Sequence, residues 1–329
     1  VAIYRDISQG VASENVANTL YSQGNNYNAM KQYQDADHCY TKALAIQREL
    51  SNGAASVDLA KTLSTQGANY YFMNRHSDAE QCFTEAVPEY REISQGAANV
   101  DIAKTLHCQG LNYTVLKKFN NADQCYTEAL TVRRELSHGT ASADIASTLR
   151  DQAVNYNHAG QCKVAEKCYD EAIAMYREIA EGDISADVAK TLSNKGNNYY
   201  NKGQYQDADQ CFTEALAIYR ELSDVDIRAD VAKNLLYQGR NYNSMRQYNE
   251  ANQCYTEALA IFWELSQGVG SVDIANTLNN KGKNYMCMKQ SKNADQCFTE
   301  VLAIDRELPE VAASVDVAKT LYNQGNNYN

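Results

Sequence analysis

The chain has ten cysteines, whose thiols could bind a metal, form disulfides or act as nucleophiles. Seven of them recur every 43 residues. Packed helices lie about 8 to 10 Å apart and a disulfide needs Cα atoms within about 7 Å, so cysteines of one row should not bridge one another. We interpret the row as small buried apolar side chains. Its members are Cys39, Cys82, Cys125, Cys168, Cys211, Cys254 and Cys297.

Histidines and acids give no sign of a catalytic or metal centre. The five histidines share no row, and His38 beside Cys39 supplies only two ligands where zinc needs more. No Ser/His/Asp set, phosphate-binding loop or isolated carboxylate pair interrupts the pattern. We expect no enzymatic activity, no cofactor and no bound metal. We interpret the periodic acids as a solvated face: Glu85, Glu128, Glu214 and Glu257.

Net charge and hydropathy narrow the range of partners. Lys and Arg total 30 against 41 Asp and Glu, so the net charge of −11 opposes binding to nucleic-acid phosphates. No apolar run of about eighteen residues or secretion signal occurs, which predicts neither a membrane span nor export. So many free thiols are typical of a reducing compartment, and we expect the cytoplasm.

The elements that position these side chains are a tandem repeat of helices. A leucine recurs every 43 residues from Leu20 to Leu321, accompanied by rows of glycine, tyrosine and alanine. Ala60, Leu63, Gly67 and Tyr70 share one face of a first helix, and Ala79 to Tyr90 repeats the pattern in a second. One pair cannot bury its apolar face alone, so neighbouring pairs must stack.

We predict an all-α solenoid over residues 1–329. Both ends match the inside of a helix, which indicates a segment of a longer array. The predicted parts are a partial second helix (1–13), a partial first helix (315–329), and repeats over about 14–56, 57–99, 100–142, 143–185, 186–228, 229–271 and 272–314.

The order Leu, Gly, Tyr, Ala, Tyr/Phe, Ala at these offsets resembles the tetratricopeptide repeat. Segments 188–192 (VAKTL), 204–208 (QYQDA) and 215–218 (ALAI) are similar to the long-helix version found in kinesin light chains and in sensor arrays of signalling proteins. The resemblance implies a right-handed superhelix whose concave face, built from the first helices, holds peptides or partner proteins.

Rows that change between copies are free of the packing constraint and predict a recognition groove on the first helices. Exposed aromatics such as Tyr71 favour binding over a bland solvent face. The lysine row at the groove edge could attract an acidic or extended peptide, although each lysine has an aspartate three residues earlier. The candidate ligand-binding residues are Lys61, Ser64, Ala68, Tyr71, Phe72, Lys104, His107, Arg150, Asn157, Lys190, Asn197, Tyr200, Lys233, Arg240, Asn243 and Lys283.

A second polar stripe recurs almost unchanged, with an asparagine in every first helix from Asn26 to Asn327. One interpretation is a buried amide seam between first helices of adjacent repeats. The other is an asparagine ladder that binds the backbone of an extended peptide.

The sequence thus predicts a non-enzymatic scaffold for protein interactions. The alternative is a sensor or autoinhibitory arm of a larger signalling protein whose NTPase or protease domain lies outside this segment.

Overall fold

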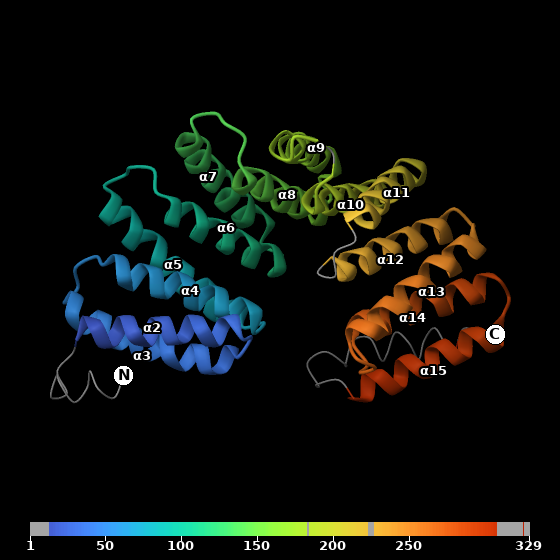
Figure 1. Ribbon diagram of the computed structural model, residues 1–329, viewed down its shortest axis with the longest axis horizontal. Helices are drawn as coiled ribbons and strands as arrows, with labels where there is room; N and C mark the ends of the chain where they lie inside the picture. The colour runs from blue at the N-terminus through green and yellow to red at the C-terminus, as the bar shows by residue number, and fades with distance from the viewer. Residues whose placement is uncertain (1–12, 183, 223–226, 308–324, 326–329) are drawn as a thin grey trace. The chain divides into compact units, whose positions relative to one another are not determined.

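The computed structural model describes residues 13–182, 184–222, 227–307 and 325. Every regular element in that part of the chain is an α-helix (Figure 1), which confirms the predicted all-α repeat fold. The predicted partial helices at the two ends lie outside the described residues, apart from Ser13 and Gly325. The first helices are α2 (Glu14–Ala29), α4 (Val57–Phe72), α6 (Val100–Val115), α8 (Ala143–His158), α10 (Ala186–Asn201), α12 (Arg228–Ser244) and α14 (Val272–Cys287). The second helices are α3 (Tyr33–Ser51), α5 (His76–Ser94), α7 (Phe119–Ser137), α9 (Cys162–Ile179), α11 (Tyr205–Leu222), α13 (Tyr248–Leu265) and α15 (Ser291–Glu307).

Local residue chemistry sets the helix ends. Ser56 precedes α4 in extended conformation, and its hydroxyl caps the helix by accepting a hydrogen bond from the backbone N–H of Leu59. Gln95 ends α5 with a left-handed φ of 50°, and Gly96 continues the turn at φ 83°. Glycine follows such a residue readily because it has no Cβ to clash.

Each repeat is held together by an aromatic ring pressed against the first-helix glycine. A Cβ added to Gly67 would lie 2.8 Å from Cε1 of Phe83, and one added to Gly24 would lie 2.6 Å from Cε1 of Tyr40. Both rings are fully buried. The glycine row therefore exists because the second helix places a ring directly on the backbone of the first.

The chain divides after Ala172 into two compact units. Within each unit, a first helix packs on the second helix of its own repeat, and that second helix packs on the first helix of the next repeat. First helices of consecutive repeats also contact each other directly, for example α4 with α6 and α12 with α14. None of the described helices combines the length and the apolar character needed to cross a membrane.

All ten cysteines are free, as predicted, and six members of the repeated row are buried. Burial raises the pKa of the Cys82 thiol to about 12. Its Sγ lies 3.8 Å from Oε1 of Gln66. A thiol with so high a pKa stays protonated and unreactive, which agrees with a packing role.

Candidate functional site

The asparagine that recurs in the first helices is buried between repeats. Five of these side chains donate from Nδ2 to the backbone carbonyl of the first residue of the preceding second helix, at 2.8 to 3.0 Å. Each of the five is at most 1% exposed, which favours the seam over the peptide ladder. Their partners show that the seam includes the second helix and not only the first helices. The donors are Asn69, Asn112, Asn155, Asn241 and Asn284, and the acceptors are Tyr33, His76, Phe119, Tyr205 and Tyr248.

One variable row contacts the next first helix rather than forming a freely exposed stripe. Ser64 Oγ lies 2.9 Å from Thr105 Oγ1, and His107 Nε2 lies 2.8 Å from Asp151 Oδ2. The side chains of His107 and Arg150 are 14% and 11% exposed. Ser64 and His107 therefore contact the next first helix, and Arg150 Nε donates to Asp151 of its own helix at 3.2 Å. None of the three lies on a fully open surface, and their part in ligand binding stays a prediction.

A second variable row supplies donors to the asparagine seam. Asn28 Nδ2 donates to Asn69 Oδ1 at 3.1 Å, and Asn243 Nδ2 donates to Asn284 Oδ1 at 2.8 Å. In the same row, Asn157 is only 7% exposed. Asn157 and Asn243 thus lie in or beside the contact between repeats, again unlike an open stripe.

Two members of this second row are tyrosines, Tyr71 and Tyr200. The first of them, Tyr71, belongs to an aromatic cluster. Tyr71 of α4 packs edge-on against Phe72 and His76, with ring centroids 5.7 and 5.5 Å apart. Phe72 stacks on Tyr33 at 5.7 Å and is 57% exposed. His76 Nδ1 lies 3.0 Å from Oδ1 of Asn112, so histidine replaces the donor that Tyr71 does not supply.

The second tyrosine of the row, Tyr200 of α10, does not donate to the seam asparagine 41 residues later, Asn241. Asn241 Oδ1 is buried and has no hydrogen-bond partner in the described part of the chain. Tyr200 packs instead against the ring of Tyr205 at 5.8 Å, and the guanidinium of Arg240 lies 5.0 Å from the Tyr200 centroid. The Ser244 hydroxyl donates to Tyr200 Oη at 3.3 Å. The tyrosine, the arginine and the unpaired amide oxygen therefore lie together in one unit.

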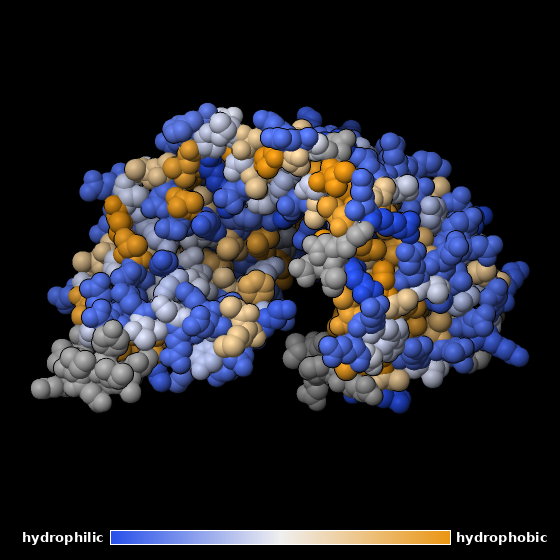
Figure 2. Space-filling view, in the orientation of Figure 1, coloured by the Kyte–Doolittle hydropathy of each residue, from blue (hydrophilic) through white to orange (hydrophobic). Residues whose placement is uncertain are grey.

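The remaining candidate residues differ in exposure. The lysines of the groove-edge row, Lys61, Lys104, Lys190 and Lys233, are exposed. Ala68, Asn197 and Lys283 are half-buried. Among the described residues, Lys61, Lys104 and Lys233 form no ion pair within 4 Å with the preceding aspartates, and the Lys61 ammonium lies 5.6 Å from the centroid of the Tyr21 ring. Figure 2 shows hydrophobic side chains on the visible face in separate patches among hydrophilic ones.

Sequence reasoning missed an ion-pair ladder along the second helices. A glutamate in each pair accepts from an arginine 37 residues earlier, so these acids are paired rather than simply solvated. The arginines and the glutamates of these pairs each recur every 43 residues, and this shared period was the signal in the sequence. The side chains are roughly half exposed, so each pair contributes at most about 1 kcal/mol. The pairs are Arg48–Glu85, Arg91–Glu128, Arg134–Glu171, Arg177–Glu214 and Arg220–Glu257.

A buried charged cluster between α6, α7 and α8 was also missed. Arg133 is 6% exposed, and its Nη1 donates to the Asp144 carbonyl at 2.7 Å and to the Thr148 hydroxyl. The same Nη1 lies 3.2 Å from Nδ1 of His107. Because a guanidinium can only donate, His107 accepts at Nδ1 and carries its proton at Nε2, facing Asp151.

These features define a tandem helical-repeat protein with exposed aromatic and basic positions on its first helices. Tetratricopeptide repeat models match residues 15–92, 101–178, 187–264 and 275–308. The chain therefore belongs to the tetratricopeptide repeat family. A search of curated proteins finds no match.

Several solved structures share the fold at low sequence identity. The apo form of RapI has a TM-score of 0.66 and 15% identity, covering 88% of this chain and 97% of its own. The apo form of the quorum sensor NprR from B. thuringiensis has a TM-score of 0.61 and 15% identity, covering 94% and 81%. The nearly identical repeats of a putative kinesin light chain from Podosopora anserina have a TM-score of 0.50 and 14% identity, covering 62% of this chain and 95% of their own.

Proposed function

We propose that this chain is a non-enzymatic scaffold that binds a peptide or partner protein through its first helices. The binding positions are the Tyr71–Phe72 cluster in one unit and the Tyr200–Arg240 cluster in the other. The observation that carries the proposal is the unpaired Oδ1 of Asn241 beside Tyr200.

That oxygen has a stability cost that is avoided at four other members of the row, Asn69, Asn112, Asn155 and Asn284, which each have a donor. A buried acceptor without a donor destabilises a protein by roughly 1 to 3 kcal/mol. Asn28 and Asn243 donate to the corresponding asparagine 41 residues later, so an asparagine at position 200 would satisfy Asn241. A tyrosine kept at such a cost favours a role outside folding, and tyrosine and arginine are the residues most enriched in binding hot spots.

The charge of the first helices supports an acidic or extended ligand. Lys61, Lys104 and Lys233 are exposed without a neighbouring carboxylate within ion-pair distance in the described residues, and Arg240 lies beside Tyr200. An acidic peptide would meet these cations while the net negative charge of the chain disfavours nucleic acid. The ten free cysteines support action in a reducing compartment, the cytoplasm.

A second candidate function is a sensor arm of a larger signalling protein, favoured by the likeness to the quorum sensor NprR. A sensor must couple ligand binding to a conformational equilibrium. Ligand addition should then alter amide hydrogen exchange in helices of both units, whereas a rigid scaffold should show protection only at the contacted first helices.

We expect Tyr200→Asn to raise the free energy of unfolding by about 1 kcal/mol, because the new amide satisfies Asn241. We expect the same variant to lower partner capture about tenfold, because a hot-spot ring is lost. Urea unfolding measures the first effect, and quantitative affinity capture with the full chain measures the second. Val269→Asn is the matched control, since Val269 is 66% exposed and lies outside both clusters. Equal capture by Tyr200→Asn and the wild type would contradict the proposal.

Phe72→Ala should lower capture by a similar factor with little change in stability. The first repeat has Ala29 at the equivalent position, so alanine is compatible with the fold. Because Phe72 is 57% exposed, the free energy of unfolding should change by less than about 1 kcal/mol. A variant that unfolds earlier but captures normally would assign Phe72 to stability.

A further inference from the structure

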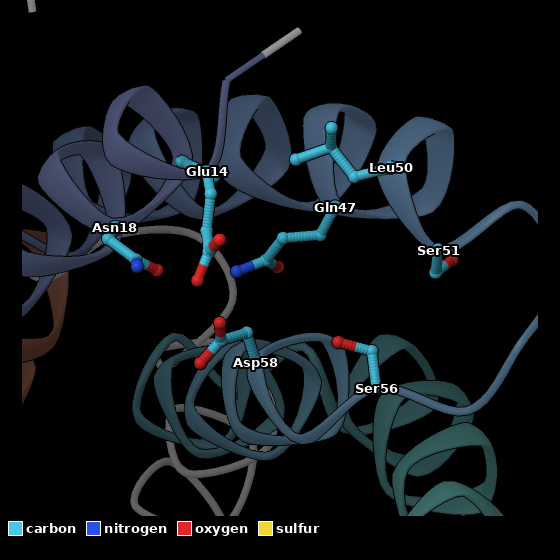
Figure 3. A pocket seen from close by; sticks show the side chains of 8 residues that line it. Glu14, Asn18, Gln47, Leu50, Ser51, Ser56 and Asp58 are labelled. Atoms are coloured by element: carbon cyan, nitrogen blue, oxygen red, sulfur yellow. The ribbon is translucent and has the colours of Figure 1, made fainter.

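A cavity of about 350 Å³ lies between α2, α3 and α4, within one unit. Figure 3 shows the polar ends of Glu14, Gln47 and Asp58 converging on it. Gln47 is 5% exposed, and its Oε1 has no hydrogen-bond partner in the described part of the chain. The cavity therefore presents a buried acceptor that lacks a donor.

Comparison with the other repeats explains why the space is empty. At the position of Gln47, later second helices carry buried rings, such as Tyr90 at 3% and Tyr219 at 2% exposure. Glutamine is shorter than tyrosine, so it does not reach the volume that the ring fills elsewhere. The cavity thus occupies the volume that an aromatic ring fills in the repeats of Tyr90 and Tyr219.

The third repeat shows that a guanidinium fits this site. Arg133 occupies the Gln47 position, and its Nη1 donates to the Asp144 carbonyl at 2.7 Å and to the Thr148 hydroxyl. Asp144 and Thr148 are the counterparts of Asp58 and Thr62. The same scaffold therefore holds a guanidinium when one is supplied by its own chain.

Charge at the cavity also differs from that of the other repeats. Glu14 stands where later first helices have valine or alanine, as at Val57, and Asn18 replaces the lysine found at Lys61. Glu14 and Asp58 are consequently joined by no cation among the described residues that line the cavity. Two carboxylates and an unpaired amide oxygen face a space that an acidic ligand could not enter favourably.

We propose that this cavity binds the guanidinium of an arginine side chain presented by a partner protein. The planar, multi-donor guanidinium can serve the two carboxylates and the Gln47 oxygen together, and the exposed Leu50 can cover its aliphatic stem. A lysine ammonium is a single point charge and cannot span these acceptors in one plane. This site is distinct from the Tyr71–Phe72 and Tyr200–Arg240 clusters.

The test uses the full chain and a fluorescent acetyl-Gly-Arg-Gly-amide peptide, with the citrulline peptide as its neutral match. The arginine peptide should bind at least tenfold more tightly than the citrulline peptide. Glu14→Val, which copies the later repeats, should weaken binding about tenfold. Gln47→Tyr and Gln47→Arg should fill the cavity from within, abolish binding and keep or raise the melting temperature.

Two further variants test whether Glu14 is needed and whether this site is separate from the Tyr200–Arg240 cluster. The Tyr90→Gln substitution opens the equivalent space in the second repeat, where Val57 stands in place of Glu14. Combined with Gln47→Tyr, it should not restore binding of the arginine peptide. Tyr200→Asn should bind the arginine peptide normally, because the proposed partner surface lies elsewhere. Equal affinity for the citrulline peptide, or unchanged binding by Gln47→Tyr, would overturn the proposal. Free arginine that competes as well as the peptide would assign the cavity to a small guanidinium metabolite and overturn the partner assignment.

Discussion

Replacing Asp151 with asparagine should destabilise the unit that contains it by about 3 kcal/mol at pH 7. Asp151 accepts from His107 Nε2 at 2.8 Å and from Arg150 Nε at 3.2 Å. Its side chain is 18% exposed, and the buried Arg133 reaches the same cluster through His107. Removing the anion leaves cations with little access to water, which is far more costly than losing a surface ion pair.

The destabilisation caused by Asp151→Asn should depend on pH. Burial opposes ionisation of Asp151, but the hydrogen bond from His107 and the charge and hydrogen bond of Arg150 outweigh it and lower the pKa of the carboxyl. Its contribution to stability is therefore complete above the ordinary aspartate pKa of about 3.9 and is lost as pH falls through the lower folded value. Urea unfolding at pH 7 and at pH 2 to 3 should show a large difference between wild type and variant at neutral pH and a small one in acid.

A variant that removes His107, Arg133 and the Asp151 charge together is the control. His107→Ser and Arg133→Tyr copy Ser64 and Tyr90 of the preceding repeat, so both residues suit the fold. Combined with Asp151→Asn, they should recover part of the lost stability, because the buried cation Arg133 is removed together with the anion, while Arg150 still loses the Asp151 carboxylate. Additive losses in the triple variant would show that the cluster does not act as a coupled unit.

The helical repeat was predictable because its packing recurs. Gly67 and Phe83 meet in the same way as Gly24 and Tyr40, so the contact appears in the sequence as two rows with one period. Helix ends were predictable where the side chain itself makes the cap, as at Ser56. Rows of this kind report contacts that every copy must form.

Exposure of the variable rows was not predictable in the same way. A position such as Ser64 changes between copies, yet it lies half-buried against Thr105. Side chains between first helices can vary because the neighbouring position compensates, as Asp151 does for His107. Variation between copies therefore excludes contact neither with the next repeat nor within the same one, since the His107 ring also packs on Tyr126 of its own repeat at 5.9 Å.

Single departures from a constant row carried more information than the variable rows. Gln47, Arg133 and Asp305 depart from a row that is otherwise aromatic, and the structure places a cavity at the first and a charged cluster at the second. The departures at Gln47 and Arg133 can be read from the sequence. Their consequences required coordinates, because they depend on Glu14 and His107 in other helices.

Asn69→Leu should lower the free energy of unfolding by about 2 to 3 kcal/mol while leaving partner capture unchanged. Asn69 is fully buried, donates to the Tyr33 carbonyl at 2.9 Å and accepts from Asn28 Nδ2 at 3.1 Å. Leucine has a similar size but no polar atoms, so it strands both partners between repeats and adds branched bulk to a close contact.

Asn26→Leu is the matched control for this effect, because Asn26 occupies the same row in α2 and is exposed. The control should change unfolding by less than about 0.5 kcal/mol. Urea unfolding and affinity capture, measured on the same preparations, separate the two roles of the asparagine row. If Asn69→Leu lowered capture and left unfolding unchanged, the row would contact a bound peptide, and the seam between repeats would have to be maintained by the neighbouring glutamines, such as Gln66, which donates to Asp37 at 2.8 Å.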